Sequence, residues 1–283
     1  MLNKITNATY YLLNDDTKER PALGLVCGDD YSLVIDAGNS SKHAQDFIKQ
    51  MKLMNVPPVK YVVITHGHWD HFLGMNEFED AIVIVNHLTD QILHKWRSVS
   101  FHDDDLHKLV DAMMVSEKHL QIIADEIPKR ESFNLQCPDL VFQESLKIDL
   151  GNKVCMLETI TSTHTDDSTI VYVPDDNVLF LGDSAYGATT RSLFHYKQDH
   201  LIPMIEEIQK YDAKYFILGH ESICDQEEMN VYWNELLSTN QVTTSPFMDE
   251  ATNSFISTFK REPNQHETIF LQAFVNDQIL RKR

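Results

Sequence analysis

Runs of apolar and β-branched residues predict that the first third of the chain is mostly β-strand. Segments 8–13, 22–27 and 31–36 each have strand length and are rich in Tyr, Leu, Val and Ile. Gly28-Asp29-Asp30 separates the last two segments and has the composition of a hairpin turn. We therefore expect an antiparallel pair of strands at this point.

A helix and two buried strands are predicted next. Ser40 or Ser41 can cap a helix that ends near Met54, with its apolar residues on one side. Two continuous apolar runs then have the pattern of strands buried on both faces, with a short helical piece between them. The two strands and the helical piece cover 59–65, 81–85 and 73–78.

The spacing of apolar residues changes to a helical period from residue 88 to about residue 127. We interpret residues 88–135 as a helical insertion in a β-rich chain, acting as a lid over a site or as an interface. Its histidines are spread out, and we expect them to lie on the surface or between helices rather than to bind a metal. They are His94, His102, His107 and His119.

The second half of the chain returns to strands and ends in helices. Strands are predicted at 146–150, 153–160, 168–173, 178–181 and 214–218, and a helix at 198–211. Residues 222–283 are expected to form a C-terminal helical extension, with a polar linker at 238–245. We expect one α/β (α+β) domain over residues 1–283, in which two strand-rich halves each carry helices.

The strand at 59–65 leads directly into a cluster of metal-binding residue types. His66, His68, Asp70 and His71 occupy six consecutive positions at its carboxyl end. Imidazole nitrogen and carboxylate oxygen are common ligands of zinc and similar divalent ions. Solvated surface histidines have no reason to be this close together, so the cluster predicts a metal site.

Three further residues of these types stand where predicted strands end. His164 lies between two strands, Asp183 follows another, and His220 follows the last. Each alone has an ordinary alternative as a turn or loop residue. Together with the first cluster they give five histidines and two aspartates, an inventory that suits two divalent ions with a shared carboxylate and open positions for water.

This order of residues resembles the metallo-β-lactamase superfamily, whose pattern is His-x-His-x-Asp-His followed by His, Asp and His. The resemblance extends over most of the chain, from about Ala8 to Glu221. It implies a four-layer αβ/βα sandwich of two packed sheets with helices outside. It also implies that the first ion is held by His66, His68 and His164, the second by Asp70, His71 and His220, and that Asp183 bridges both.

Departures from particular branches of the family narrow the expected activity. The true β-lactamases place a cysteine near the position of Asp183, and the redox diiron branch has Glu where this chain has His68. The resemblance therefore argues against antibiotic hydrolysis and against diiron redox chemistry. Asp36 lies in a stretch similar to the family's early Asp-x-Gly turn, and this implies a supporting role near the metals.

The resemblance favours a hydrolase with a dinuclear, zinc-type centre that cleaves a small-molecule ester, most plausibly a lactone. Iron or manganese would suit the same ligand types. Asp70 would orient the nucleophile, and Tyr186, three residues after Asp183, would stabilise the oxyanion as in lactone-hydrolysing members. The alternatives are a thioesterase resembling glyoxalase II, a phosphodiesterase or nuclease, and a mononuclear-iron dioxygenase.

Composition limits the partners of the protein. The net charge is −19, with 43 acidic and 24 basic residues. This charge argues against a nucleic-acid partner, because a protein that binds nucleic acid normally needs a basic face. A membrane partner is not expected, since no apolar run reaches the roughly 18 residues of a span. The N-terminus lacks a signal-peptide pattern, and four scattered cysteines are typical of reduced thiols. We expect a cytoplasmic enzyme with a small-molecule substrate and allow for a homodimer.

Overall fold

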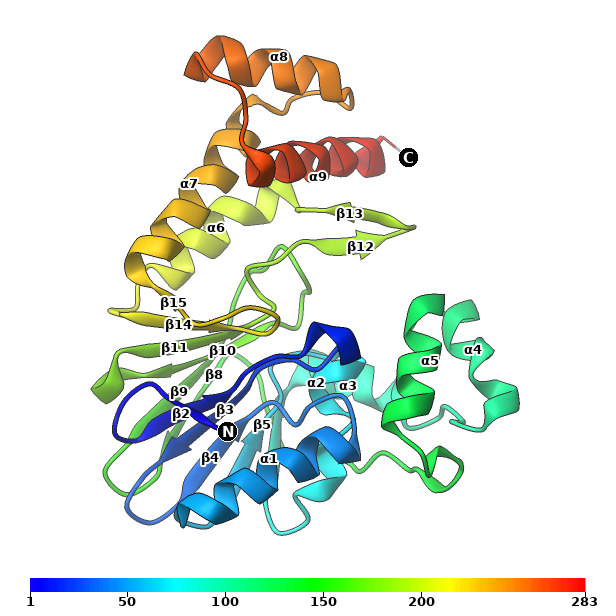
Figure 1. The fold of residues 1–283 in the computed structure, drawn as a ribbon, viewed down its shortest axis with the longest axis vertical. Coiled ribbons are helices and arrows are strands. Elements are labelled where there is room, and N and C mark those ends of the chain that lie inside the picture. Colours follow the sequence, from blue (N-terminus) through cyan, green and yellow to red (C-terminus); the bar gives the residue numbers. More distant parts are fainter. Residues whose placement is uncertain (283) are drawn as a thin grey trace.

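A computed structural model describes residues 1–282; its two large β-sheets pack face to face, and a third sheet is a two-stranded hairpin (Figure 1). The first sheet has its strands in chain order: β1 (Asn3–Lys4), β2 (Thr9–Leu12), β3 (Leu23–Cys27), β4 (Ser32–Ile35), β5 (Val59–Val63), β6 (Ile82–Asn86) and β7 (Leu140–Phe142). The second has the spatial order β15 (Cys224–Asp225), β14 (Tyr215–Leu218), β11 (Val178–Gly182), β10 (Thr169–Val173), β9 (Val154–Thr159) and β8 (Ser145–Asp149).

The pairing of the strands brings their carboxyl ends together. In the first sheet β4, β5, β6 and β7 run parallel to one another. In the second sheet β11 and β14 are also parallel. Side chains that follow β4, β5, β11 and β14 therefore emerge at one edge of each sheet, which is where open α/β structures place their ligands.

Helices cover the outer face of each sheet and complete four layers. The helices are α1 (Ser41–Met54), α2 (Trp69–Phe72), α3 (His87–Trp96), α4 (His107–Asp111), α5 (Glu117–Glu126), α6 (Gln198–Ile208), α7 (Gln226–Val242), α8 (Met248–Phe259) and α9 (Gln265–Arg281). α1 packs on the first sheet, while α6 and α7 pack on the second. The predicted four-layer αβ/βα sandwich with a helical insertion and C-terminal helices is confirmed.

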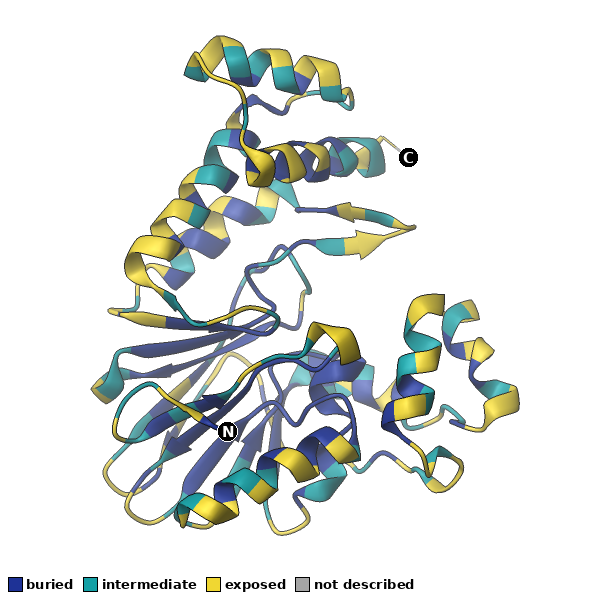
Figure 2. Cartoon of the chain, in the orientation of Figure 1, coloured by how far each residue is buried: buried dark blue, intermediate teal, exposed yellow. Residues whose placement is uncertain are grey.

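The central strands are buried on both faces, as their continuous apolar runs predicted. In β5, Val62 joins the cluster beneath α1, whereas its neighbour Val63 joins the cluster between the two sheets. Phe180 of β11 enters the same intersheet cluster from the opposite sheet. Figure 2 shows this burial along the strands, with exposed residues concentrated on the outer faces of the helices. The strands that carry the site are thus held from both sides.

The first helix begins and ends where the sequence predicted. The Ser40 side chain accepts a hydrogen bond from the backbone N–H of His43, and Ser41 is the first helical residue. Asn55 ends the helix in the left-handed conformation, which an asparagine adopts readily. The predicted hairpin around Gly28 is also present, since β3 and β4 pair antiparallel with Cys27 opposite Ser32.

The predicted helical insertion contains α3, α4 and α5; α3 packs on β6 and β7, while α4 and α5 project to one side of the molecule (Figure 1). The apolar residues of the insertion, among them Trp96, Leu109 and Ile123, join the cluster beneath α1. At the end of α5 the buried carboxylate of Glu126 accepts hydrogen bonds from the Arg20 guanidinium at 2.8 Å and from Ser40 at 3.1 Å. One end of the insertion is therefore anchored in the domain.

The predicted polar linker at 238–245 is wrong in its first half, because α7 continues to Val242. The hydroxyl groups of Thr239 and Thr243 bond back to carbonyls of the preceding turn. Val242 packs with Phe255 of α8 and Leu271 of α9 in a small cluster of its own. None of the helices within residues 1–282 is long and apolar enough to cross a membrane.

Candidate metal centre

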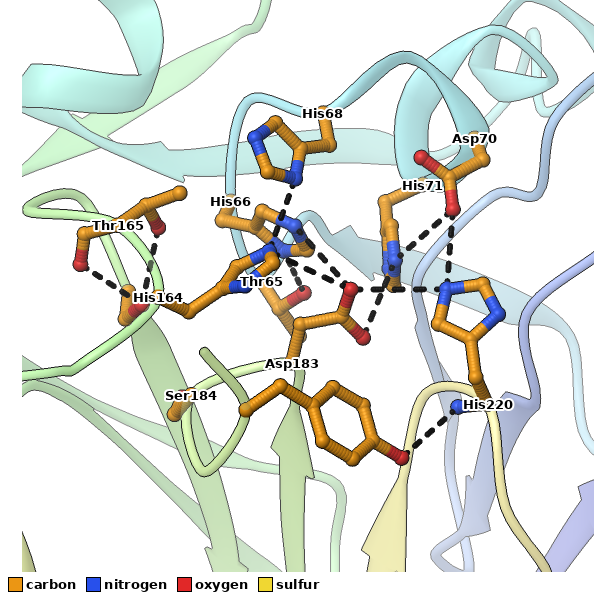
Figure 3. Close-up of polar contacts among 12 residues, drawn as sticks. Thr65, His66, His68, Asp70, His71, His164, Thr165, Asp183, Ser184 and His220 are labelled. Carbon is orange, nitrogen blue, oxygen red and sulfur yellow. Dashed lines mark hydrogen bonds and ion pairs between the residues drawn. The ribbon is translucent and has the colours of Figure 1, made fainter. Parts of the chain in front are cut away.

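The structure brings together all seven residues that the sequence predicted as metal ligands (Figure 3). His66, His68, Asp70 and His71 come from the loop and short helix α2 that follow β5. The others come from strand ends far along the chain: His164 between β9 and β10, Asp183 after β11 and His220 after β14. The edge at which the parallel strands end is thus the site.

One group of ligand atoms consists mainly of imidazoles. His66, His68, His164 and Asp183 each offer an atom, and these atoms lie within 4.8 Å of one another. His164 Nε2 is 2.9 Å from His68 Nδ1 and 3.5 Å from Asp183 Oδ2. We call the three histidines of this group, His66, His68 and His164, the three-histidine set.

A second group lies beside the first and mixes imidazoles with a carboxylate. Asp70, His71 and His220 also place one ligand atom each within 4.8 Å. Asp70 Oδ2 is 3.1 Å from His220 Nε2 and 3.5 Å from His71 Nε2. Asp183 reaches this group as well, with its two oxygens each 3.5 Å from a histidine: Oδ1 from His71 and Oδ2 from His220. We call Asp70, His71 and His220 the mixed set, and Asp183 lies between the two sets.

Three buried atoms of the centre have no hydrogen-bond partner among residues 1–282. They are His66 Nε2, His71 Nε2 and Asp183 Oδ1. A buried polar atom without a partner costs free energy, and natural proteins contain few of them. Divalent cations would satisfy all three, because imidazole nitrogen and carboxylate oxygen are suitable donors. The residues therefore fit a metallo-β-lactamase metal centre, whose metal identity the geometry leaves open.

The charges of the mixed set favour protonated histidines in the metal-free protein. Burial disfavours an imidazolium at His220, yet the carboxylates of Asp183 and Asp70 outweigh it and raise the pKa of His220 to about 10. The same balance, with Asp36 added, raises the pKa of His71 well above its usual value. Burial opposes the charge on Asp70, but His71 and His220 lower the pKa of Asp70 to about 2.

The three-histidine set has the opposite tendency. Burial, reinforced by the neighbouring His68, lowers the pKa of His164 to about 4. Burial together with His71 and His68 lowers the pKa of His66 well below its usual value. These imidazoles are neutral at pH 7, and the neutral form is the one that coordinates a metal.

Asp36 supports the centre from behind, as the resemblance implied. Its carboxylate accepts hydrogen bonds from the backbone N–H of Thr65 at 2.8 Å and from the Thr65 hydroxyl at 2.9 Å. Its Oδ2 is also 2.8 Å from His71 Nδ1. A carboxylate partner of this kind fixes the orientation of a ligand histidine and directs the other nitrogen, here Nε2, towards the ion.

Sequence reasoning missed two supporting groups. The buried Asp167 accepts hydrogen bonds from the backbone N–H of Gly67 at 2.7 Å and from the Thr89 hydroxyl at 2.8 Å, so it joins the two ligand loops. The carbonyl of Gly187 lies 2.6 Å from His164 Nδ1. No feature of the sequence marked Asp167 as a supporting residue, apart from its position beside Asp166. A backbone carbonyl cannot be recognised from the sequence at all.

Two aromatic residues near the motif have different positions. Tyr186 Oη accepts a hydrogen bond from the backbone N–H of His220 at 3.2 Å, which places this phenol at the mixed set. Burial, with Asp183 nearby, raises the pKa of Tyr186 well above its usual value, so the phenol keeps its proton. Trp69 is buried and packs against the ring of His119, at 5.5 Å between centroids. Trp69 therefore packs beneath the loop and supports it.

A cavity of about 590 Å³ lies beside the mixed set and is lined partly by His220. Its other walls include four carboxylate side chains, those of Asp15, Asp16, Glu221 and Glu228. No Lys or Arg lines this cavity among the described residues. The approach past His220 is thus strongly acidic.

Comparisons with known proteins agree with this architecture. A family model described as the metallo-beta-lactamase superfamily matches residues 22–220. No curated protein matches the chain. Among solved structures, a metallo-beta-lactamase from Pontibacter korlensis has 17% identity and a TM-score of 0.56, covering 83% of this chain and 97% of its own. TMB-1 has 15% identity and a TM-score of 0.55, covering 83% of this chain and 95% of its own.

A third solved structure is the stereoselective inverting sec-alkylsulfatase Pisa1 from Pseudomonas sp.. It has 12% identity and a TM-score of 0.66, and the match covers 98% of this chain but 50% of the sulfatase. At these identities the three structures show that the fold is shared, without carrying over a substrate.

Proposed function

The chain belongs to the metallo-β-lactamase superfamily, whose members are mostly hydrolytic enzymes, and we propose that it is a hydrolase with a dinuclear centre that cleaves an ester bond of a small molecule. A lactone is the substrate type that we favour. The observation that carries this proposal is the arrangement of two adjoining ligand sets around one shared carboxylate, that of Asp183.

In this proposal His66, His68 and His164 hold one ion, while Asp70, His71 and His220 hold the other. Asp183 would be shared by both ions, because its carboxylate oxygens lie 3.5 Å from nitrogens of both sets. Zinc is the metal we favour, and iron or manganese are alternatives with the same donor types. Two such ions would supply an activated water and polarise the oxygen of the scissile group.

Two side chains of the protein would then orient the nucleophile and stabilise the oxyanion. Asp70 Oδ2 lies 3.1 Å from His220 Nε2 in the mixed set, and its carboxylate would accept a hydrogen bond from the attacking water and pass a proton to the leaving oxygen. Tyr186 already accepts the His220 N–H and retains its own proton, so its hydroxyl can donate to the developing oxyanion.

The electrostatics of the approach support an uncharged substrate. The four carboxylates beside His220 would repel a phosphodiester or a sulfate ester, and the net charge of −19 adds to that effect. An ester or lactone carries no charge and escapes this repulsion. The same argument weighs against the nuclease alternative.

The glyoxalase II-like alternative has little support in the C-terminal extension. That type of enzyme holds glutathione with basic residues, and Lys260 and Arg261 are the candidates here. Both guanidinium NH groups of Arg261 donate to Glu267 at 2.6 Å. This cation is therefore already committed to an ion pair within the extension.

A substrate panel and a metal analysis test the proposal. We expect two equivalents of metal in the purified protein, turnover of an acyl-lactone or an aryl ester, and little turnover of a thioester or a phosphodiester. His68→Ala is the control that should abolish the activity. Clear phosphodiester turnover without ester turnover would reverse our choice, and a single bound iron would favour the dioxygenase alternative.

A further inference from the structure

The orientation of His164 depends on a single backbone carbonyl. His164 Nδ1 lies 2.6 Å from the carbonyl oxygen of Gly187. A carbonyl can only accept, so Nδ1 carries the proton and Nε2 presents its lone pair to the three-histidine set. The position of the Gly187 carbonyl therefore sets both the tautomer and the direction of this ligand.

Gly187 is in turn held by a short hairpin, formed by β12 (Ala188–Thr190) and β13 (Leu193–His195). A Cβ at Gly187 would lie 2.6 Å from the His195 carbonyl oxygen and 2.8 Å from the Phe194 ring. Glycine is the residue that allows this approach. The returning strand β13 thus lies directly against Gly187. The position of β13 therefore determines the position of the Gly187 carbonyl.

The hairpin is fixed from the other side by α9, which lies next to it in Figure 1. The Asn276 amide donates a hydrogen bond to the Phe194 carbonyl at 2.7 Å. Asp277 Oδ1 is 3.4 Å from His195 Nδ1. His195 Nε2 is 3.1 Å from the Thr190 hydroxyl, so this histidine connects α9 to both strands of the hairpin.

Asp277 is well placed to act as a rigid anchor. Its side chain is buried, with 5% of the residue exposed. Its Oδ2 accepts from the backbone N–H of Gln198 at the start of α6 and from Arg281 Nε at 2.6 Å. Next to it, Tyr196 packs against Phe270 and Phe274 of α9, with ring centroids 5.7 Å apart in both pairs. A buried carboxylate that accepts several hydrogen bonds is held in a single conformation.

We propose that Asn276 and Asp277 of α9 are positioning residues for His164, acting through β13 and the Gly187 carbonyl. The C-terminal extension is then part of the metal centre, although it lies outside the region that the family model matches. This inference rests on the proposed role of His164 as a metal ligand. The inference concerns the three-histidine set alone. The contacts that lead from α9 through β13 and Gly187 to His164 do not include Asp70, His71 or His220.

The test compares metal affinities in the full-length protein. An Asn276→Ala/Asp277→Asn double variant should bind the ion of the three-histidine set about tenfold more weakly, the lower end of the effect of losing a supporting group. The ion of the mixed set should bind unchanged. Zn²⁺ titration against a competing chelator gives both affinities, and Co²⁺ substitution gives a spectrum for each site.

Arg261→Gln is the matched control, because Arg261 precedes α9 and pairs with Glu267 in its first turn, at the end of the helix opposite to Asn276 and Asp277. It removes the ion pair with Glu267 and weakens α9 without touching the hairpin. We expect a lower thermal midpoint and unchanged affinities for both ions. Equal affinities in the control and the double variant would show a merely structural role and overturn the proposal.

Gly187→Ala provides a second route if the double variant does not fold. The added methyl group must push β13 away from Gly187, so the same selective tenfold loss is expected with α9 intact. Wild-type affinity in Gly187→Ala would contradict the inference. Failure of the proposed function looks different, since the wild-type protein itself would then bind no pair of ions.

Discussion

The two ligand sets lie side by side but differ in charge. In the three-histidine set, burial lowers the pKa of His164 to about 4 and the pKa of His66 well below its usual value. The mixed set pairs imidazoles with carboxylates, and the pKa of His220 is raised to about 10. One set is therefore ready to receive an ion at neutral pH, whereas the other must exchange protons for it.

The comparison shows that the pKa of a buried histidine depends on the groups around it. His66 and His71 come from one loop and are both buried, with 1% and 0% of the residue exposed. Only His71 contacts Asp36 behind it at 2.8 Å, with Asp70 and Asp183 in front. Burial and neighbouring imidazoles lower the pKa of His66, whereas three carboxylates outweigh burial and raise the pKa of His71.

Replacing the group that both sets share should have the largest effect. Asp183→Asn removes a charge that lies 3.5 Å from nitrogens of each set. We expect loss of at least one ion, weaker binding of the other, and a fall in ester hydrolysis of about 10⁴-fold, equivalent to several kcal/mol of metal assistance. Metal content and initial rates measure this. If Asp183→Asn retained both ions in full, the bridging role of Asp183 would be contradicted.

Replacing one histidine in each set should separate them. His164→Gln and His220→Gln should each lose one ion and about 10²- to 10³-fold in rate. Their effects on the metal-free protein should differ. His164→Gln costs about 1 kcal/mol for a neutral hydrogen bond, and His220→Gln costs about 2 kcal/mol or more because it leaves the buried Asp70 carboxylate without its partner. Urea unfolding in chelator distinguishes them, and equal costs would contradict the assigned charges.

Removing the carboxylate behind the mixed set should weaken one site only. Asp36 has φ of 61°, a conformation that asparagine also tolerates, so Asp36→Asn preserves the backbone. We expect a 10- to 100-fold loss of affinity for the ion near His71, in the range typical of supporting carboxylates. Chelator competition measures it. The affinity of the three-histidine set is the internal control, and an equal loss there would mean that the loop itself had moved.

Tyr186→Phe should lower hydrolysis without affecting either ion. The variant removes a hydroxyl that contacts the protein through the His220 N–H, and it leaves every ligand atom in place. We expect about a tenfold fall in kcat, smaller than for an oxyanion donor acting without a metal. Steady-state kinetics with a lactone, beside metal analysis, would show this. An unchanged kcat would exclude Tyr186 from catalysis.

The smallest effect is on the stability of the metal-free protein as a function of pH. The raised pKa of His220 means that its protonated form stabilises the fold fully below pH 6.5, and that this contribution is lost as the pH rises through about 10. Between pH 7 and 9 the metal-free protein should lose at least about 1 kcal/mol, the equivalent of one pKa unit. His220→Gln should flatten this slope, and an identical slope would contradict the charge assignment.

Much of the fold was predictable because its signals are local. Ser40 and the apolar spacing predicted α1, and continuous apolar runs predicted β5 and β6. The hairpin β12–β13 and the strand β7 were missed, since Ala188-Thr189-Thr190 has no apolar alternation and Leu140–Phe142 is only three residues long. Their strand character comes from tertiary contacts rather than from sequence.

The ligands were predictable, but most of the groups that support them were not. The close spacing of the residues from His66 to His71 identifies them as candidate ligands. His164, Asp183 and His220 are recognised because they follow apolar runs. Asp36 was found only through the family resemblance. The Gly187 carbonyl and Asp167 act through contacts with residues 23 and 100 positions away in the chain, so no local pattern can reveal them.

The contact between α9 and β13 has a consequence for the order of events during synthesis. Every ligand from His66 to His220 is translated before the residues of α9. Synthesis runs from the N-terminus, and a domain generally folds as a unit. The Asn276 contact that holds the hairpin beside His164 can therefore form only after all seven ligands have been translated. Full affinity of the three-histidine set would then require that α9 has been synthesised.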